Sequence, residues 1–250
     1  MQERGRLYPF IKLALSPAIK GLRIGLSPSF RFRSLLKKEI IMKHPHWYYF
    51  AALSEDVQRT ARFVEPIQDN FKTYSIEFAR LYLAICSEID VIAKLLCHQV
   101  NPQAPVKRID DYRPVILAKY PDFPLVEVNF QQSELLLTPW EQWGNGKNPA
   151  WWGRHNNVKH QRDKFYHEAN LENTLNALGG LYISVGYLYA DDLRDCCLPP
   201  LQHFVGFGAK YFSGSSFGPK GTITGFRLPG IPRSKSQLKA LKEMGVTPSQ

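Results

Sequence analysis

The segment from Asn70 to Val100 constrains the fold most, because its apolar residues recur with helical spacing. The stripe continues for about eight turns at 3.6 residues per turn and consists of Phe71, Tyr74, Phe78, Leu81, Ile85, Ile89, Ile92 and Leu96. Asn101-Pro102 ends it, since proline disfavours the helical conformation in the residue before it. A helix with such a stripe must bury it against other elements. The sequence therefore predicts a bundle built around this helix.

Other patterns add helices and a small β element. Helical spacing recurs over residues 46–64, 110–119 and 171–188. Residues 126–128 and 135–137 are short runs of strand-forming residues on either side of a polar segment, which favours a hairpin. The expected fold class is mainly α, a helical bundle with a small β-hairpin insertion.

The basic residues divide the chain into three regions. The net charge is +10, but residues 42–197 carry 16 basic and 19 acidic residues, so the excess lies at the two ends. The expected organisation is a basic N-terminal extension over 1–41, a helical domain over 42–195 and a flexible basic tail over 196–250 rich in Gly, Ser and Pro. Because Lys38-Glu39 can be encoded by a bacterial ribosome-binding sequence, translation starting at Met42 is one hypothesis for the extension. A transit peptide is the other.

The tail carries aromatic residues among Gly and Lys, a composition that allows stacking on RNA bases, although a solvated extension has the same composition. These aromatics are Phe204, Phe207, Tyr211, Phe212, Phe217 and Phe226. Cys86 and Cys97 fall in the long predicted helix and are expected in the core, and Cys196-Cys197 is a poor geometry for an ordinary disulfide. This cysteine usage favours a reducing, cytoplasmic setting. No apolar run approaches the length of about 20 residues that spans a bilayer, so no membrane partner is expected.

A second stretch, from Asn148 to His167, concentrates titratable and planar side chains beyond what packing requires. Asn148 is a favourable N-cap and Pro149 suits the first helical position, so a helix is expected to begin there. Asn170 is expected to cap the next helix. The residues seven apart on the expected buried face are Trp151, Val158 and Phe165.

Arginine and histidine in this helix are suited to phosphodiester chemistry without a metal. Histidine can move the proton of a ribose hydroxyl, and arginine can stabilise the charged phosphorane. No two of the histidines have the spacing of a helical zinc site, so no metal or cofactor is expected. The candidate catalytic residues are Arg154, His155, His160, Arg162 and His167. The candidate binding or supporting residues are Trp151, Trp152, Asn156, Lys159, Glu88 and Asp90.

A structural role is the alternative for these polar residues. In that case the cationic side chains Arg154, Arg162 and His167 pair with acidic residues of the long helix. The acidic residues in question are Glu77, Glu88 and Asp90. The protein is then a non-catalytic dimerisation or partner-binding module.

The motif Arg154-x5-His160, and likewise Arg162-x4-His167, resembles the Arg-x(4–6)-His signature of the HEPN superfamily. HEPN domains are small helical bundles, usually dimeric. Many are metal-independent ribonucleases of toxin–antitoxin and phage-defence systems, and others are inactive binding modules. The resemblance implies that one of these two Arg–His pairs is catalytic. It also implies RNA, a second copy of the chain or another protein as partner.

The same stretch resembles an uncharacterised group of bacterial helical proteins that share a Trp-Trp…Asn-x-Val-Lys-His-x-Arg pattern. The matching residues are Trp151, Trp152, Asn156, Val158, Lys159, His160 and Arg162. That similarity extends back to the long predicted helix around Glu88 and Asp90, and it implies no activity.

Overall fold

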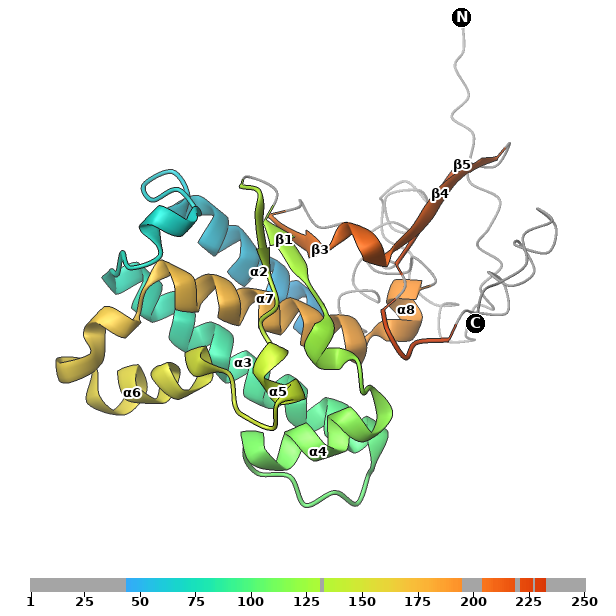
Figure 1. Cartoon of the computed structure of the whole chain (residues 1–250), viewed down its shortest axis with the longest axis horizontal. Coiled ribbons are helices and arrows are strands. Elements are labelled where there is room, and N and C mark those ends of the chain that lie inside the picture. Colours follow the sequence, from blue (N-terminus) through green and yellow to red (C-terminus); the bar gives the residue numbers. More distant parts are fainter. Residues whose placement is uncertain (1–43, 131–132, 195–203, 219–220, 227, 233–250) are drawn as a thin grey trace, which may run out of the picture. The chain divides into compact units, whose positions relative to one another are not determined.

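A computed structural model of the chain describes residues 44–130, 133–194, 204–218, 221–226 and 228–232 (Figure 1). The α-helices are α2 Pro45–Thr60, α3 Ile76–Val100, α4 Ile109–Lys119, α5 Glu141–Gly144, α6 Ala150–Phe165, α7 Leu171–Leu188 and α8 Ala190–Arg194. Short 3-10 turns are η2 Gln68–Asn70, η3 Phe123–Leu125, η4 Tyr166–Glu168 and η5 Ala209–Tyr211. The strands are β1 Val128–Phe130, β2 Leu135–Leu137, β3 Val205–Phe207, β4 Phe212–Gly218 and β5 Gly221–Phe226.

Helix α3 realises the predicted apolar stripe, but it starts later than expected. Ser75 is its N-cap, and the Ser75 hydroxyl accepts a 3.0 Å hydrogen bond from the Phe78 N–H. The preceding residues are not helical, because Tyr74 forms an antiparallel bridge with Asn170. Residues 71–75 therefore match the helical spacing without being part of a helix. The ion pairs Glu77–Arg80 and Asp90–Lys94 are confirmed on the flanks of α3.

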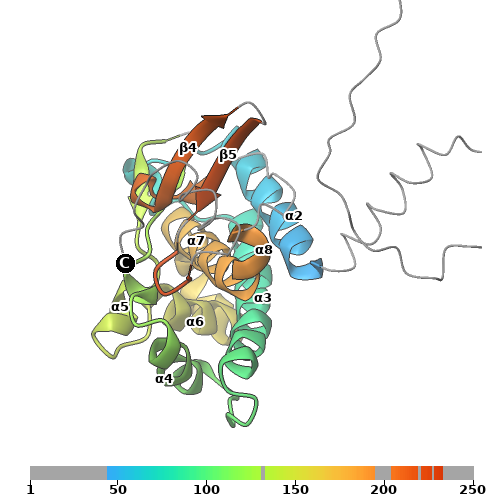
Figure 2. The same cartoon turned by 90° about the vertical axis from the view of Figure 1, so that its right-hand side faces the viewer.

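The core forms around two helices, α3 and α7. They pack against each other, and α2 and α6 contact both of them (Figure 2). Helix α4 packs mainly on α3. Cys86 and Cys97 are fully buried in this core, as expected. The prediction of a mainly helical fold is confirmed.

The small sheet is antiparallel and has the strand order β2-β1-β3. The predicted hairpin is present as β1 and β2, but its first strand lies at Val128–Phe130 instead of 126–128, and Phe130 is opposite Leu135. Helix α7 lies directly on the sheet because glycines face it. A Cβ at Gly179 would stand 2.7 Å from Val128 Cγ2, and one at Gly186 would stand 2.8 Å from Phe207 Cζ. The neighbouring Gly180 faces α6, since a Cβ there would stand 3.1 Å from Trp151 Cζ2.

The third strand comes from the region that the sequence analysis assigned to a flexible tail. Val205–Phe207 pairs with β1, and Tyr211 donates a 2.8 Å hydrogen bond to the Leu125 carbonyl. Phe204, Phe207 and Tyr211 are buried, so they are not available to stack on RNA. The packed structure therefore continues beyond the expected boundary at residue 195. The extension 1–41, Cys196-Cys197 and residues 233–250 lie outside the described residues.

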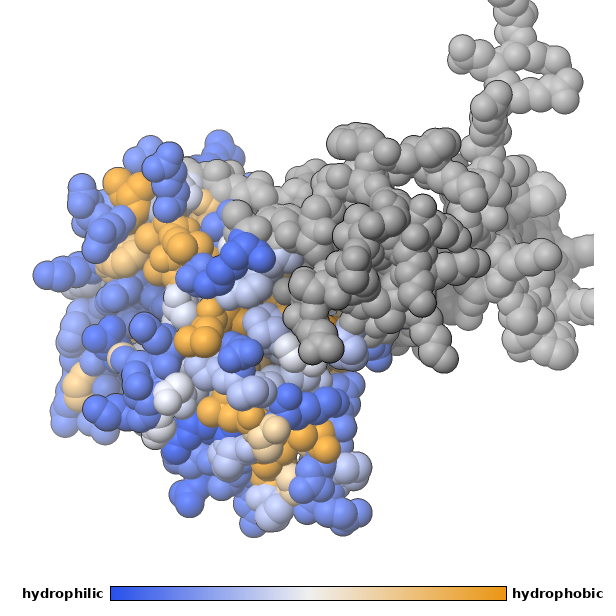
Figure 3. Space-filling model, turned by 45° about the vertical axis from the view of Figure 1, so that its right-hand side comes forward, coloured by the Kyte–Doolittle hydropathy of each residue, from blue (hydrophilic) through white to orange (hydrophobic). Residues whose placement is uncertain are grey.

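On the face drawn in Figure 3, hydrophobic residues occur in separate groups surrounded by hydrophilic ones. Large apolar side chains that are exposed among the described residues include Phe63, Ile76, Leu125 and Leu136. None of the helices within the described ranges is long and apolar enough to cross a bilayer.

Candidate functional site

Helix α6 carries most of the candidate residues, and its start differs from the expected one by a residue. Pro149 is the N-cap and the helix begins at Ala150. Asn148 instead joins α6 to α4, since its side chain donates to Asp110 at 2.8 Å and accepts from Arg113 at 3.4 Å. The beginnings of α4 and α6 are thereby held together.

Arg154 faces α7. Its Nη1 donates a 3.0 Å hydrogen bond to Asn173 Oδ1 and lies 3.7 Å from Glu172 Oε2. The guanidinium therefore helps to hold α6 against α7. It does not line the cleft described below.

The acidic residues of α3 do not pair with α6 as the structural alternative required. Glu88 Oε1 lies 2.6 Å from His46 Nδ1 of α2. Asp90 accepts hydrogen bonds from the Lys94 ammonium at 2.5 Å and from the Tyr112 hydroxyl at 2.6 Å. The expectation that Glu88 or Asp90 binds Arg154 is wrong, because nearer partners on α2, α3 and α4 occupy both carboxylates.

The remaining Arg–His candidates are exposed: His160, Arg162 and His167. Gln161 has non-helical dihedral angles (φ −141°, ψ 47°), so α6 is kinked between His160 and Arg162. His167 lies beyond the end of α6, in η4. Within the described part of the chain, no hydrogen bond or ion pair joins Arg154 to His160 or Arg162 to His167.

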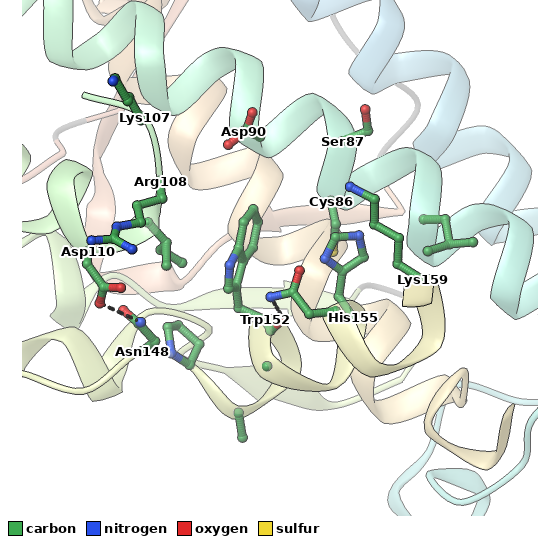
Figure 4. Close-up of a pocket in the computed structure, with 16 residues that line it drawn as sticks. Cys86, Ser87, Asp90, Lys107, Arg108, Asp110, Asn148, Trp152, His155 and Lys159 are labelled. Atoms are coloured by element: carbon green, nitrogen blue, oxygen red, sulfur yellow. Dashed lines mark hydrogen bonds between the residues drawn. The ribbon is translucent and has the colours of Figure 1, made fainter. Parts of the chain in front are cut away.

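The two adjacent tryptophans have different surroundings. Trp151 lies in the core, where its indole N–H donates to the Pro139 carbonyl at 2.8 Å and its ring contacts Trp140. Trp152 is 8% exposed and lines a cleft between α3, α4 and α6 (Figure 4). Trp151 therefore supports the fold, and Trp152 belongs to the site.

The cleft has a volume of about 800 Å³, which is in the size range of small-molecule sites. Helix α3 contributes Leu83, Cys86, Ser87 and Asp90. The start of α4 contributes the residues Lys107, Arg108, Ile109 and Asp110. The start of α6 contributes Asn148, Pro149 and Ala150, and the following turns contribute Trp152, Gly153, His155, Asn156 and Lys159.

His155 is the buried titratable group of this cleft. It is 6% exposed and packs against Tyr82 and Trp152, with ring centroids 5.9 and 5.4 Å away. Burial and the charges of Lys159 and His160 lower the pKa of His155 to about 4, so its imidazole is neutral at pH 7. Its Nδ1 is buried and has no hydrogen-bond partner within the described residues. A buried imidazole nitrogen without a partner costs free energy, which a ligand with a hydrogen-bonding group would recover.

Three cations line the cleft: Lys107, Arg108 and Lys159. No ion pair to another described residue is found for any of them. Of the two lining carboxylates, Asp90 is paired with Lys94, whereas Asp110 accepts the uncharged Asn148 amide and keeps its charge, so the cations outnumber the unpaired carboxylate by three to one. The neighbouring carboxylate of Asp111 accepts the backbone N–H groups of residues 107 and 108, which holds its pKa below the usual range. The unpaired charge in the cleft is therefore positive.

The backbone adds to this positive character. Helices α4 and α6 both begin at the cleft, and the first N–H groups of a helix have no intrahelical partner and carry partial positive charge. Gly153 also lines the cleft, and a Cβ placed there would meet no atom within 4 Å. Neither sterics nor helix stability requires glycine at this position. Its effect is to leave the helix backbone uncovered toward the cleft.

The cleft offers neither an activated thiol nor a group of metal ligands among the described residues. Burial raises the pKa of the Cys86 thiol well above its ordinary value, so the thiol is not an activated nucleophile. Among the residues that the structure describes, no three His, Cys, Asp or Glu side chains are grouped to bind a metal ion.

Sequence reasoning found one wall of the cleft and missed the other. Trp152, His155, Asn156 and Lys159 were among the candidates. Lys107 and Arg108 were not, because only the fold brings them to α6. Their signal in the sequence was a pair of adjacent basic residues directly before a predicted helix.

Comparisons with protein-family models, with curated proteins and with solved structures find no match to this chain.

Proposed function

We propose that this protein binds a phosphate-bearing ligand, with RNA as the expected class, in the cleft between α3, α4 and α6. One observation carries the proposal: three cations that form no ion pair among the described residues line the same cleft as a buried imidazole whose Nδ1 has no hydrogen-bond partner there. Phosphate oxygens accept hydrogen bonds from Lys, Arg and helix N-termini alike. The same ligand can reach all three kinds of donor in this cleft.

Metal-independent RNA cleavage is a second candidate function, because the buried imidazole of His155 lines the cleft on the same side as Lys159. A neutral imidazole can accept the proton of a ribose 2′-hydroxyl, whose oxygen then attacks the adjacent phosphorus. The bond from phosphorus to the 5′-oxygen breaks, and the proton on His155 passes to that leaving oxygen. Lys159, on the same side of Trp152 as His155, would stabilise the negative charge on the phosphorane. The products are a 2′,3′-cyclic phosphate and a 5′-hydroxyl.

This proposal uses different residues from the HEPN-like signature. Arg154 is engaged with Asn173 and Glu172, so Lys159 takes the electrostatic role. His155 takes the place of His160 because His155 lies in the cleft. The HEPN resemblance, a second copy of the chain and a protein partner remain hypotheses beside it.

A short oligouridylate in EDTA tests both functions with the full-length chain. Its 2′-O-methyl form cannot be cleaved and reports binding by fluorescence anisotropy. We expect Lys159→Gln to weaken this binding about tenfold, because it removes a charge-assisted contact to phosphate. With the 2′-hydroxyl form, we expect cyclic phosphate ends from the wild type and a loss of about 100-fold in His155→Gln.

Lys164→Gln is the matched control, since Lys164 is exposed on the same helix and does not line the cleft. It is expected to bind like the wild type. Equal weakening in both lysine variants would refute the cleft as the binding site. Cleavage that survives in His155→Gln but is lost in His160→Ala or His167→Ala would restore the HEPN-like pairs in its place.

A further inference from the structure

The cleft has two positively charged ends with an aromatic wall between them. In Figure 4, Lys107 and Arg108 lie on one side of Trp152, and Lys159 lies on the other. His155 is on the Lys159 side. A ligand with one compact anionic group can use one end only.

The spacing along α6 fixes the separation of the two ends. Trp152 and Lys159 are seven residues apart, so they share a face of the helix and are separated by about 10 Å along its axis. His155 and Asn156 fall between them on the same face. A ligand that reaches from Lys159 to the start of α6 must therefore extend over this face.

The other end combines side chains with backbone. Lys107 and Arg108 precede α4, and the starts of α4 and α6 are joined there by the hydrogen bond from Asn148 to Asp110. Asp110 lies at the same end, and its carboxylate repels a phosphate there, so Lys107 and Arg108 together must outweigh that repulsion. This end is fitted for a phosphate that stays accessible to solvent.

The middle of the cleft is suited to an uncharged planar group. Trp152 is largely buried, and the small part of its ring that faces the cleft can contact a planar group of the ligand. The bare backbone at Gly153 leaves room for close approach at the next position. Asp90, on the opposite wall, has lone pairs beyond those used by Lys94 and Tyr112 and can accept from an amino or imino N–H.

We propose that the cleft binds a single nucleotide that carries a phosphate on both its 5′ and 3′ sides. This inference rests on the proposed function and names the ligand unit that the same site takes. One phosphate binds Lys159 beside His155, the other binds Lys107 and Arg108, and the base lies against Trp152. Such a unit occurs within an RNA strand and in a free nucleoside 3′,5′-bisphosphate.

Isothermal titration of the full-length chain with uridine 3′,5′-bisphosphate, uridine 5′-monophosphate and uridine 3′-monophosphate tests the inference. We expect the bisphosphate to bind about tenfold more tightly than either monophosphate, because it alone engages both ends. Lys159→Gln and Arg108→Gln should each reduce bisphosphate binding to about the level of a monophosphate. Each variant should weaken the binding of one of the two monophosphates and leave the affinity for the other nearly unchanged.

Inorganic pyrophosphate is the control for charge alone, since its two phosphates are adjacent and cannot reach across Trp152. It is expected to bind no better than a monophosphate. A 2′-O-methyl trinucleotide, compared with the free bisphosphate, tells whether the unit is read within RNA. Equal affinity of the bisphosphate and both monophosphates would overturn the inference while leaving the proposed function intact. If none of the nucleotides binds, the inference is overturned, and the oligouridylate measurement alone then decides the proposed function.

Discussion

Gly153 is the residue at which fold and proposed function make opposite demands. It lies in the first turns of α6, where alanine is more favourable than glycine by about 1 kcal/mol. A Cβ there meets no atom of the chain within 4 Å. We therefore expect Gly153→Ala to raise the free energy of unfolding by about 0.5–1 kcal/mol and to weaken binding of uridine 3′,5′-bisphosphate. Urea unfolding and titration calorimetry measure the two effects. A stabilised variant with unchanged affinity would mean that no ligand approaches this backbone.

His155 links pH to stability. Its pKa is about 4 in the folded chain and 6.5 in an unfolded one, so the unfolded chain binds more protons between these values. Above pH 6.5 His155 is uncharged in both states and does not lower the free energy of unfolding. As the pH falls from 6.5 toward 4, that free energy decreases by an amount on the order of 3 kcal/mol. Lys159 and His160 add to the loss by repelling the charged imidazole, and Asp90 opposes it.

Because Gln cannot titrate, His155→Gln should lose less stability than the wild type between pH 7 and about 4.5. Urea midpoints at the two pH values measure the difference. His98→Gln, a change at an exposed histidine of α3, should follow the wild type. Equal losses in all three proteins would contradict the burial of an uncharged His155.

At the scale of elements, the contact between α7 and the sheet depends on the absence of a side chain. A Cβ at Gly179 would stand 2.7 Å from Val128 Cγ2 and 3.0 Å from Pro139 Cγ. We expect Gly179→Ala to lower the free energy of unfolding by about 1–3 kcal/mol, since overpacking outweighs the gain in helix propensity. Gly153→Ala is the matched control, because the same substitution in open space should stabilise. The same sign for both variants would show that the sheet moves away from α7 without cost.

The elements themselves could be predicted where local signals decide them. The stripe of α3 and the Asn170 cap of α7, whose side chain accepts from the Asn173 N–H at 3.0 Å, were readable from the sequence. The start of α3 was not, because Phe71 and Tyr74 fit the helical spacing. Backbone hydrogen bonds from α7 decide it, with Leu171 donating to the Thr73 carbonyl. Such a contact joins segments that no local pattern relates.

At the scale of the whole molecule, the site was half predictable for the same reason. Trp152, His155 and Lys159 share one helix, so their spacing placed them together. Which way Arg154 points depends on Asn173 of the next helix, and the position of Lys107 depends on how α4 docks on α3. Both are tertiary facts. The sequence therefore favoured phosphate chemistry in this helix, but it named two Arg–His pairs that no hydrogen bond joins among the described residues.

The central position of β1 also bears on how the chain is made. Its second neighbour, β3, lies more than seventy residues further along the sequence. At synthesis rates of about 5–20 residues per second, the ribosome needs on the order of ten seconds to deliver it. During that interval one edge of β1 carries unpaired N–H and C=O groups, a template for pairing with other nascent chains. Translation that pauses in this interval would expose the protein to aggregation, and a chaperone that covers a strand edge would protect it.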